Sequence, residues 1–120
     1  MSEKIILRVY EVIGSNMAVA SDDGQKVYDQ IATAISKDGK VELSFENIEN
    51  LTSAFLNAAV GQLYGTVAED KIRNSLTVAH IEPDDVALLK RVVETAKEYF
   101  RDPSRVTAAR HNVLGDEDEE

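Results

Sequence analysis

Residues 41–65 read VELSFENIENLTSAFLNAAVGQLYG and pass from the pattern of a strand to that of a helix. Val41, Leu43 and Phe45 alternate with polar residues, which is the period of a strand with one buried face. After a short polar turn, apolar side chains over residues 51–64 nearly encircle a helical axis. We therefore expect a strand that delivers the chain into a deeply buried helix.

The chain before this stretch predicts a hairpin and a further helix. Residues 5–13, IILRVYEVI, are rich in β-branched side chains and stop at the turn signal of residues 14–16. A short second strand over residues 17–20 would complete an antiparallel hairpin. A helix from Ser21 to about Lys37 should follow, because side-chain oxygens that can cap a helix precede apolar residues at helical spacing.

The chain after this stretch predicts one more strand and one more helix. Residues 76–81 have the composition of a strand, and the helix should begin at Pro83 and run to about Phe100. Strands that are joined through helices favour right-handed crossovers and parallel pairing. We therefore expect an α/β fold, in which a mixed sheet of about four strands, the N-terminal hairpin plus parallel strands, is covered by three helices.

The length of 120 residues suits one domain. We place the folded domain at residues 1–102 and a flexible acidic C-terminal tail at residues 103–120, because the apolar period fades after the last helix. The formal net charge is −9, and the acidic run of residues 116–120 supplies five of these charges, which leaves about −4 for the remainder. Like charges in such a run repel one another and oppose ordering.

Composition also bears on compartment and partners. The mildly acidic remainder should repel nucleic acid, whose binding depends on clustered Lys and Arg. The uncharged run of residues 50–68 approaches the length of a membrane span, but its polar residues and two glycines favour a buried helix instead. No signal-peptide pattern is seen at the amino end, and cysteine is absent. We expect a cytoplasmic protein that binds neither nucleic acid nor membrane.

Catalytic and metal-binding patterns are weak in this sequence. His111 falls in the predicted tail, and His80 falls at a strand end, where an imidazole is more often structural than catalytic. The acidic residues of the run 80–85 could suggest a metal site, but negative charge at the start of the helix at Pro83 explains them. Phosphate-binding glycine motifs are absent. We expect no catalytic residues, no metal and no cofactor.

The junction between the strand at 41–45 and the helix at 51–64 offers the strongest candidate site. Thr52 and Ser53 place two hydroxyls where backbone donors at a helix start are unpaired. One interpretation is that either residue simply caps the helix. The other is that the helix start binds an anion, a phosphoryl group or another molecule.

The quoted stretch resembles the STAS-like domains of unknown function, in which a strand ending in an aromatic precedes a Thr-Ser-x-Phe-Leu turn into a helix. The earlier IGSNMAVASDDGQKVYDQIATAI at 13–35 and the later NSLTVAHIEPDDVALLKRVVETA at 74–96 occupy the corresponding places. The likeness therefore covers about residues 5–100. STAS domains proper, among them bacterial anti-sigma factor antagonists, carry an Asp-Ser-Ser/Thr-Gly motif at this turn. A kinase of the histidine-kinase ATPase type phosphorylates its second hydroxyl residue.

Residues 52–55 align with that motif, but only Ser53 matches it, and Ala54 holds the position of the phosphorylated residue. The phosphorylation switch is therefore not carried over. The resemblance implies a prokaryotic, non-catalytic signalling module that binds a protein partner, for example a histidine-kinase-type ATPase. The alternative is a sensor that binds a nucleotide or another anion at the same helix start. The expected partner-binding or switch residues are Asn50, Thr52, Ser53 and Asn57.

Overall fold

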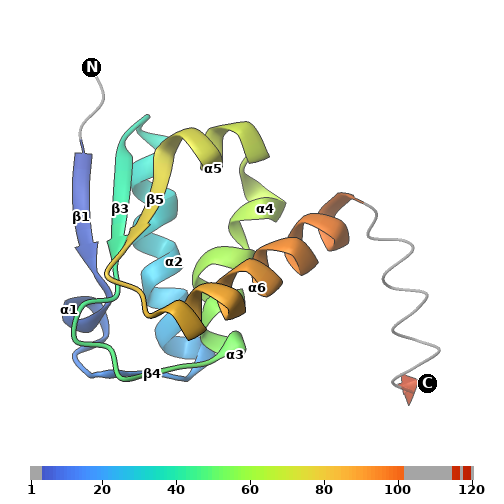
Figure 1. Cartoon of the computed structure of the whole chain (residues 1–120). Coiled ribbons are helices and arrows are strands. Elements are labelled where there is room, and N and C mark those ends of the chain that lie inside the picture. Colours follow the sequence, from blue (N-terminus) through green and yellow to red (C-terminus); the bar gives the residue numbers. More distant parts are fainter. Residues whose placement is uncertain (1–3, 102–114, 117, 120) are drawn as a thin grey trace.

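The computed structural model describes residues 4–101, 115, 116, 118 and 119 (Figure 1). In chain order the elements are β1 Lys4–Arg8, α1 Val9–Ile13, β2 Met17–Ala18, α2 Ser21–Ser36, β3 Lys40–Ser44, β4 Asn50–Leu51, α3 Ser53–Leu56, the π-helical turn η1 Asn57–Gly61, α4 Leu63–Thr66, α5 Glu69–Ser75, β5 Leu76–Ala79, α6 Pro83–Arg101, β6 Gly115–Asp116 and β7 Asp118–Glu119.

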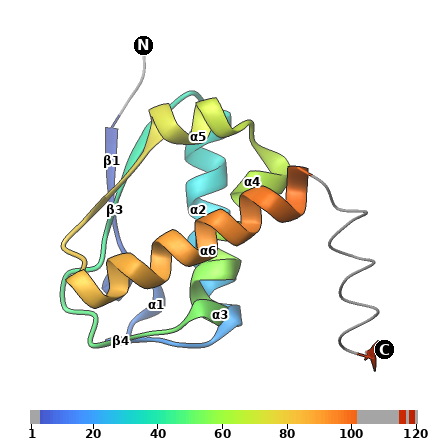
Figure 2. The ribbon, with the colours of Figure 1, turned by 45° about the vertical axis from the view of Figure 1, so that its right-hand side comes forward.

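The central sheet has three parallel strands in the order β1-β3-β5. Leu7, Leu43 and Val78 lie side by side in this register and face the helical layer. Helices α2 and α6 and the segment from α3 to α4 all lie on that side of the sheet (Figures 1 and 2). The result is a two-layer α/β domain whose core lies between the sheet and the helices.

The predicted N-terminal hairpin is wrong. The apolar stretch at residues 5–13 divides into β1 and the short helix α1, which Gly14 ends in a left-handed conformation with φ of 71°. The next strand, β2, does not return to β1 but pairs in parallel with β4, forming a separate two-stranded sheet. A short apolar run cannot by itself distinguish a strand from a buried helical turn, and Val9 is fully buried in α1.

The helix predicted after the turn at residues 14–20 is confirmed as α2, which buries Val27, Ile31 and Ile35. It packs closely against the segment that contains α3 and η1. A Cβ atom added at Gly24 would come within 2.5 Å of the Phe55 carbonyl oxygen and within 2.8 Å of the Ala58 Cβ. The missing side chain at Gly24 therefore sets how near the two helical segments can lie.

The single helix predicted over residues 51–64 is only partly correct. Asn50 and Leu51 form β4, the helix begins at Ser53, and a π-helical turn at η1 separates α3 from α4. These departures depend on tertiary contacts, because β4 exists only where β2 lies beside it. The apolar residues of this segment are buried as expected, and Phe55 and Leu56 are fully inaccessible.

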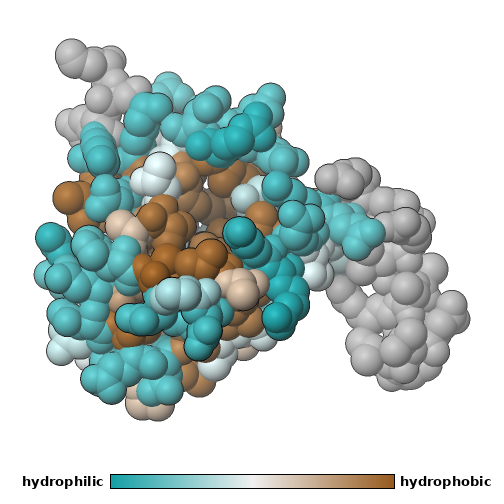
Figure 3. All heavy atoms as spheres, viewed as in Figure 1, coloured by the Kyte–Doolittle hydropathy of each residue, from teal (hydrophilic) through white to brown (hydrophobic). Residues whose placement is uncertain are grey.

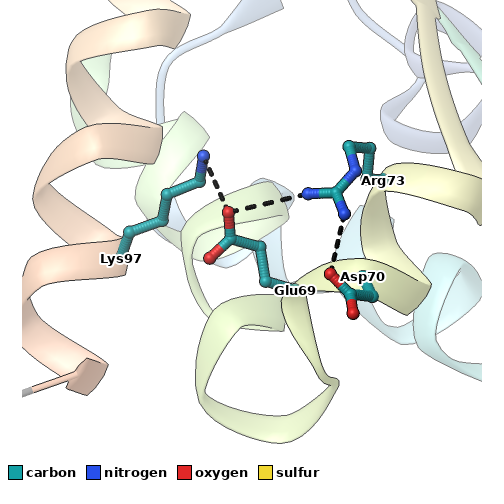
Figure 4. A network of polar contacts seen from close by, with 4 residues as sticks. All are labelled: Glu69, Asp70, Arg73 and Lys97. Atoms are coloured by element: carbon teal, nitrogen blue, oxygen red, sulfur yellow. Dashed lines mark hydrogen bonds and ion pairs between the residues drawn. The ribbon is translucent and has the colours of Figure 1, made fainter.

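The strand and the helix predicted near the end of the domain are confirmed as β5 and α6. The sequence did not predict α5, a polar helix of seven residues. Ile72 anchors α5 in the core with an exposed fraction of 2%. Glu69 contacts Lys97 of α6 at 3.2 Å, and Arg73 contacts Asp70 within α5 at 2.7 Å (Figure 4). Since Ile72 is the single apolar residue of α5, no apolar period revealed this helix.

The predicted domain boundary and flexible tail fall largely outside the described residues. Within the residues that the structure does describe, none of the helices combines the length and the apolar character that crossing a bilayer requires.

The close approach at Gly24 makes a testable prediction. Gly24→Ala should lower the free energy of unfolding by about 1–3 kcal/mol, because the added methyl group would clash with the Phe55 carbonyl group. This loss should occur although alanine favours a helix by about 1 kcal/mol over glycine. The measurement is urea unfolding followed by circular dichroism.

Gly61→Ala is the matched control, because a Cβ atom there would come no nearer than 3.4 Å to a neighbour. Its stability should stay unchanged or rise by up to about 1 kcal/mol. A Gly24→Ala protein as stable as the unaltered chain would show that α2 does not need this glycine.

Candidate functional site

Thr52 joins β4 to α3 and serves as the helix cap. Its backbone is extended, with φ of −122° and ψ of 161°, and its hydroxyl oxygen accepts a hydrogen bond from the Phe55 N–H at 3.2 Å. The same hydroxyl donates to the Val19 carbonyl oxygen at 2.7 Å, and the Thr52 N–H donates to the Ala18 carbonyl oxygen at 3.2 Å. The capping interpretation is therefore confirmed for Thr52, whose hydroxyl is occupied on both sides.

Ser53 differs from its neighbour in being exposed. It is the first residue of α3, and its side chain makes no hydrogen bond to another described residue. The following Phe55 and Leu56 are fully buried and fix the helix start against the core. Of the two hydroxyls predicted at this junction, only that of Ser53 is available to another molecule.

Asn50 precedes Ser53 by three residues, lies on β4 and is also exposed. Its partner across the two-stranded sheet is Met17, whose exposed fraction is 51%. Val19, whose carbonyl oxygen accepts the hydrogen bond from the Thr52 hydroxyl, has an exposed fraction of 37%. We call this set of residues, Met17, Val19, Asn50 and Ser53, the β2–β4 platform.

The sequence did not predict the apolar half of the platform. Met17 and Val19 were assigned to a hairpin strand, so no contact with residues 50–53 was expected. Their alternation with Ala18 and Ala20 was the available signal, since alternation in a strand places every second side chain on the same face. What the sequence lacked was the identity of the neighbouring strand.

Asn57 follows Ser53 by one helical turn, and its backbone N–H donates to the Ser53 and Ala54 carbonyl oxygens. It begins the π-helical turn η1 and is exposed. It also lines a hollow of about 360 Å³ with Gly61 and residues at the end of α6, including Phe100. The structure thus places Asn50, Thr52 and Ser53 at the start of α3, and places Asn57 at its other end, on the border of a separate hollow.

His80 lies away from this site. Its Nδ1 atom is 3.0 Å from the Oγ atom of Ser44, a buried residue of β3 that also receives the Glu46 N–H. His80 and Asn47 have left-handed backbones, with φ of 57° and 69°, and both line a hollow of about 380 Å³ at the carboxyl ends of β3 and β5. The sequence did not identify Ser44, because a serine inside a strand carries no distinguishing pattern.

The acidic residues near His80 lie at the start of a helix, as we predicted from the sequence. Asp84 and Asp85 are in the first turn of α6, and the N–H groups of Asp85 and Val86 both donate to the Glu82 carbonyl oxygen. In the described part of the chain, no three His, Cys, Asp or Glu side chains come close enough together to hold a metal ion.

A third hollow lies between β5 and α6. Figure 3 shows apolar atoms gathered around it, and its volume is about 180 Å³. Leu76 and Val78 of β5 face Leu89 and Val93 of α6 across this space. Tyr64 also lines it, and burial raises the pKa of its hydroxyl above the ordinary value. None of the four predicted site residues lies in this hollow.

The bonds of Thr52 predict how the platform is held together. Thr52→Ala should cost about 1–2 kcal/mol of stability, because it removes the helix cap and the bond to Val19. Thr52→Ser should keep most of this stability, since it retains the hydroxyl. Ser53→Ala should change stability by less than about 0.5 kcal/mol. Chemical denaturation of the three variants tests this, and equal losses at both positions would contradict it.

Comparison with known proteins agrees with this architecture. A family model described as a STAS-like domain of unknown function matches residues 23–86, just over half of the chain. The matched range runs from the first turn of α2 to the first turn of α6 and includes residues 50–57. No curated protein and no solved structure gave a match. The chain therefore belongs to the family of STAS-like domains of unknown function.

Proposed function

We propose that this protein is a non-catalytic regulatory module that binds a protein partner through the β2–β4 platform. The observation that carries the proposal is the exposure of Met17 and Val19 on the segment that lies beside the junction presenting Ser53. Large apolar side chains that remain in water beside polar groups are typical of contacts between proteins.

The platform is supported from beneath in a way that suits a docking surface. Phe55, Leu56 and Ala18 are fully buried directly under it. The Thr52 hydroxyl links the helix start to β2. A surface that is ordered before binding loses less conformational entropy when a partner arrives.

The polar groups of the domain give little support to catalysis. The His80 ring is bonded to the buried Ser44, and Ser53 lies at a different junction of the fold. Nucleophilic catalysis requires a base within hydrogen-bond reach of an accessible hydroxyl. A binding role needs no such pair.

The class of partner that we propose rests on the resemblance to STAS domains proper. STAS domains that use this turn bind signalling proteins, so a prokaryotic, cytoplasmic ATPase of the histidine-kinase type is the partner that we propose. Ala54 stands where the phosphorylated residue of those domains would be, and it has no hydroxyl. Recognition in this protein would therefore depend on the shape and charge of the platform and not on modification at that position.

Binding of a nucleotide or another anion at the same helix start is the competing function. One of the backbone donors that an anion would use, the Phe55 N–H, is already bonded to Thr52. A thermal-shift screen of nucleotides and inorganic phosphate tests it, because a ligand that binds only the folded state raises the melting temperature. We expect no shift, and a concentration-dependent rise that Ser53→Glu abolishes would favour the sensor instead.

The platform predicts the effect of a new charge at Ser53. Ser53→Glu should reduce recovery of the partner from native cell extract at least several-fold, because a buried, unpaired carboxylate would be desolvated in the contact. Met17→Asp should have a similar effect on the apolar half of the platform. Both proteins should remain folded, since both positions are exposed. The measurement is quantitative mass spectrometry of proteins retained by the immobilised chain.

Thr33→Glu is the matched control, because Thr33 is an exposed hydroxyl residue on α2 outside the platform. It should retain the partner at the level of the unaltered chain. Equal recovery by all three variants would remove the platform from the interface.

A further inference from the structure

The strand β1 lies at one end of the sheet and pairs with β3 alone. The backbone N–H and C=O groups along its other edge therefore form no hydrogen bonds with a described strand. Ile5 and Ile6 remain 40% and 49% exposed, one on each face of the strand. Such an edge is able to accept an added strand from another chain.

The charges along β1 are unlike those of the domain as a whole. Lys4 and Arg8 are exposed and share with Ile6 the face of the sheet that is turned away from the helices. Lys4 contacts Glu42 at 3.3 Å, while in the described part of the chain no carboxylate lies within ion-pair distance of Arg8. An acidic protein thus presents two cations with an exposed isoleucine between them.

From this arrangement we infer a second interaction surface: the free edge of β1 takes up an extended segment of a partner protein with the pattern acidic, apolar, apolar, apolar, acidic. Opposed residues of paired strands lie on the same face, about 4.5–5.5 Å apart. The two acidic residues would therefore lie opposite Lys4 and Arg8, and the apolar residues would cover Ile5, Ile6 and Leu7. The pattern is symmetrical, so the segment can add in either direction.

The same charges oppose pairing between two copies of this protein. In an antiparallel pair centred on Ile6, Lys4 of one copy would lie opposite Arg8 of the other. Like charges in directly opposed positions destabilise a sheet. The edge is thus protected against self-association and selects a partner of opposite charge. This surface is separate from the β2–β4 platform, so either one can fail its test while the other stands.

The test uses the full chain labelled with ¹⁵N and the synthetic peptide Gly-Ser-Glu-Val-Ile-Val-Glu-Ser-Gly. We expect chemical-shift changes concentrated in β1 and slower hydrogen exchange of the β1 amides that point away from β3. The same peptide with lysine in place of both glutamates should not bind. Added salt should weaken binding of the acidic peptide, because the ion pairs are exposed.

Charge reversal at Arg8 distinguishes recognition from simple protection of the edge. Arg8→Glu should weaken binding of the acidic peptide on the order of fivefold to tenfold and bring the affinities of the two peptides close together, because Lys4 still faces one end of each peptide. Lys90→Glu makes the same change of charge on the exposed face of α6 and should have no effect. If Arg8→Glu does not fold, Arg8→Gln provides the same comparison, with a smaller loss of affinity for the acidic peptide. The inference is overturned by equal binding of the two peptides to the unaltered chain, by shifts that lie outside β1, or by dimers formed through β1.

Discussion

The absence of a side chain at Gly24 is the constraint on which the arrangement of this domain depends. It lets α2 approach the backbone of the α3–η1 segment to a distance that any larger residue would prevent. That approach buries Phe55, Leu56 and Ala59 between the two helical segments and the sheet. With the buried half of the segment fixed, its exposed first residue, Ser53, has a defined position.

The hydrogen bonds of the Thr52 hydroxyl link the start of α3 to the exposed residues beside it. By accepting from the Phe55 N–H and donating to the Val19 carbonyl oxygen, the hydroxyl connects the helix start to the residue that follows β2, more than thirty residues earlier in the chain. The capping and binding interpretations of this junction are therefore not exclusive. Thr52 provides the structural bond, and its neighbour Ser53 remains open to a partner.

The two interaction surfaces that we propose for this STAS-like domain lie mainly on its strands. The β2–β4 platform lies along the β2–β4 sheet and the start of α3, and the free edge of β1 is one margin of the three-stranded sheet. An unpaired strand edge is a general means of recognition, and the charge on that edge determines which partners are excluded.

The sequence by itself determined the elements whose apolar period is strong: α2, β3, β5 and α6, together with the hydroxyls at the start of the buried helix. Periodicity is local, so it can be read from neighbours along the chain. Only the tertiary structure decided that β2 pairs with β4, that Met17 lies beside Asn50, and that His80 bonds Ser44. These contacts join residues more than thirty positions apart, and no local pattern records which distant strand or side chain will supply the partner.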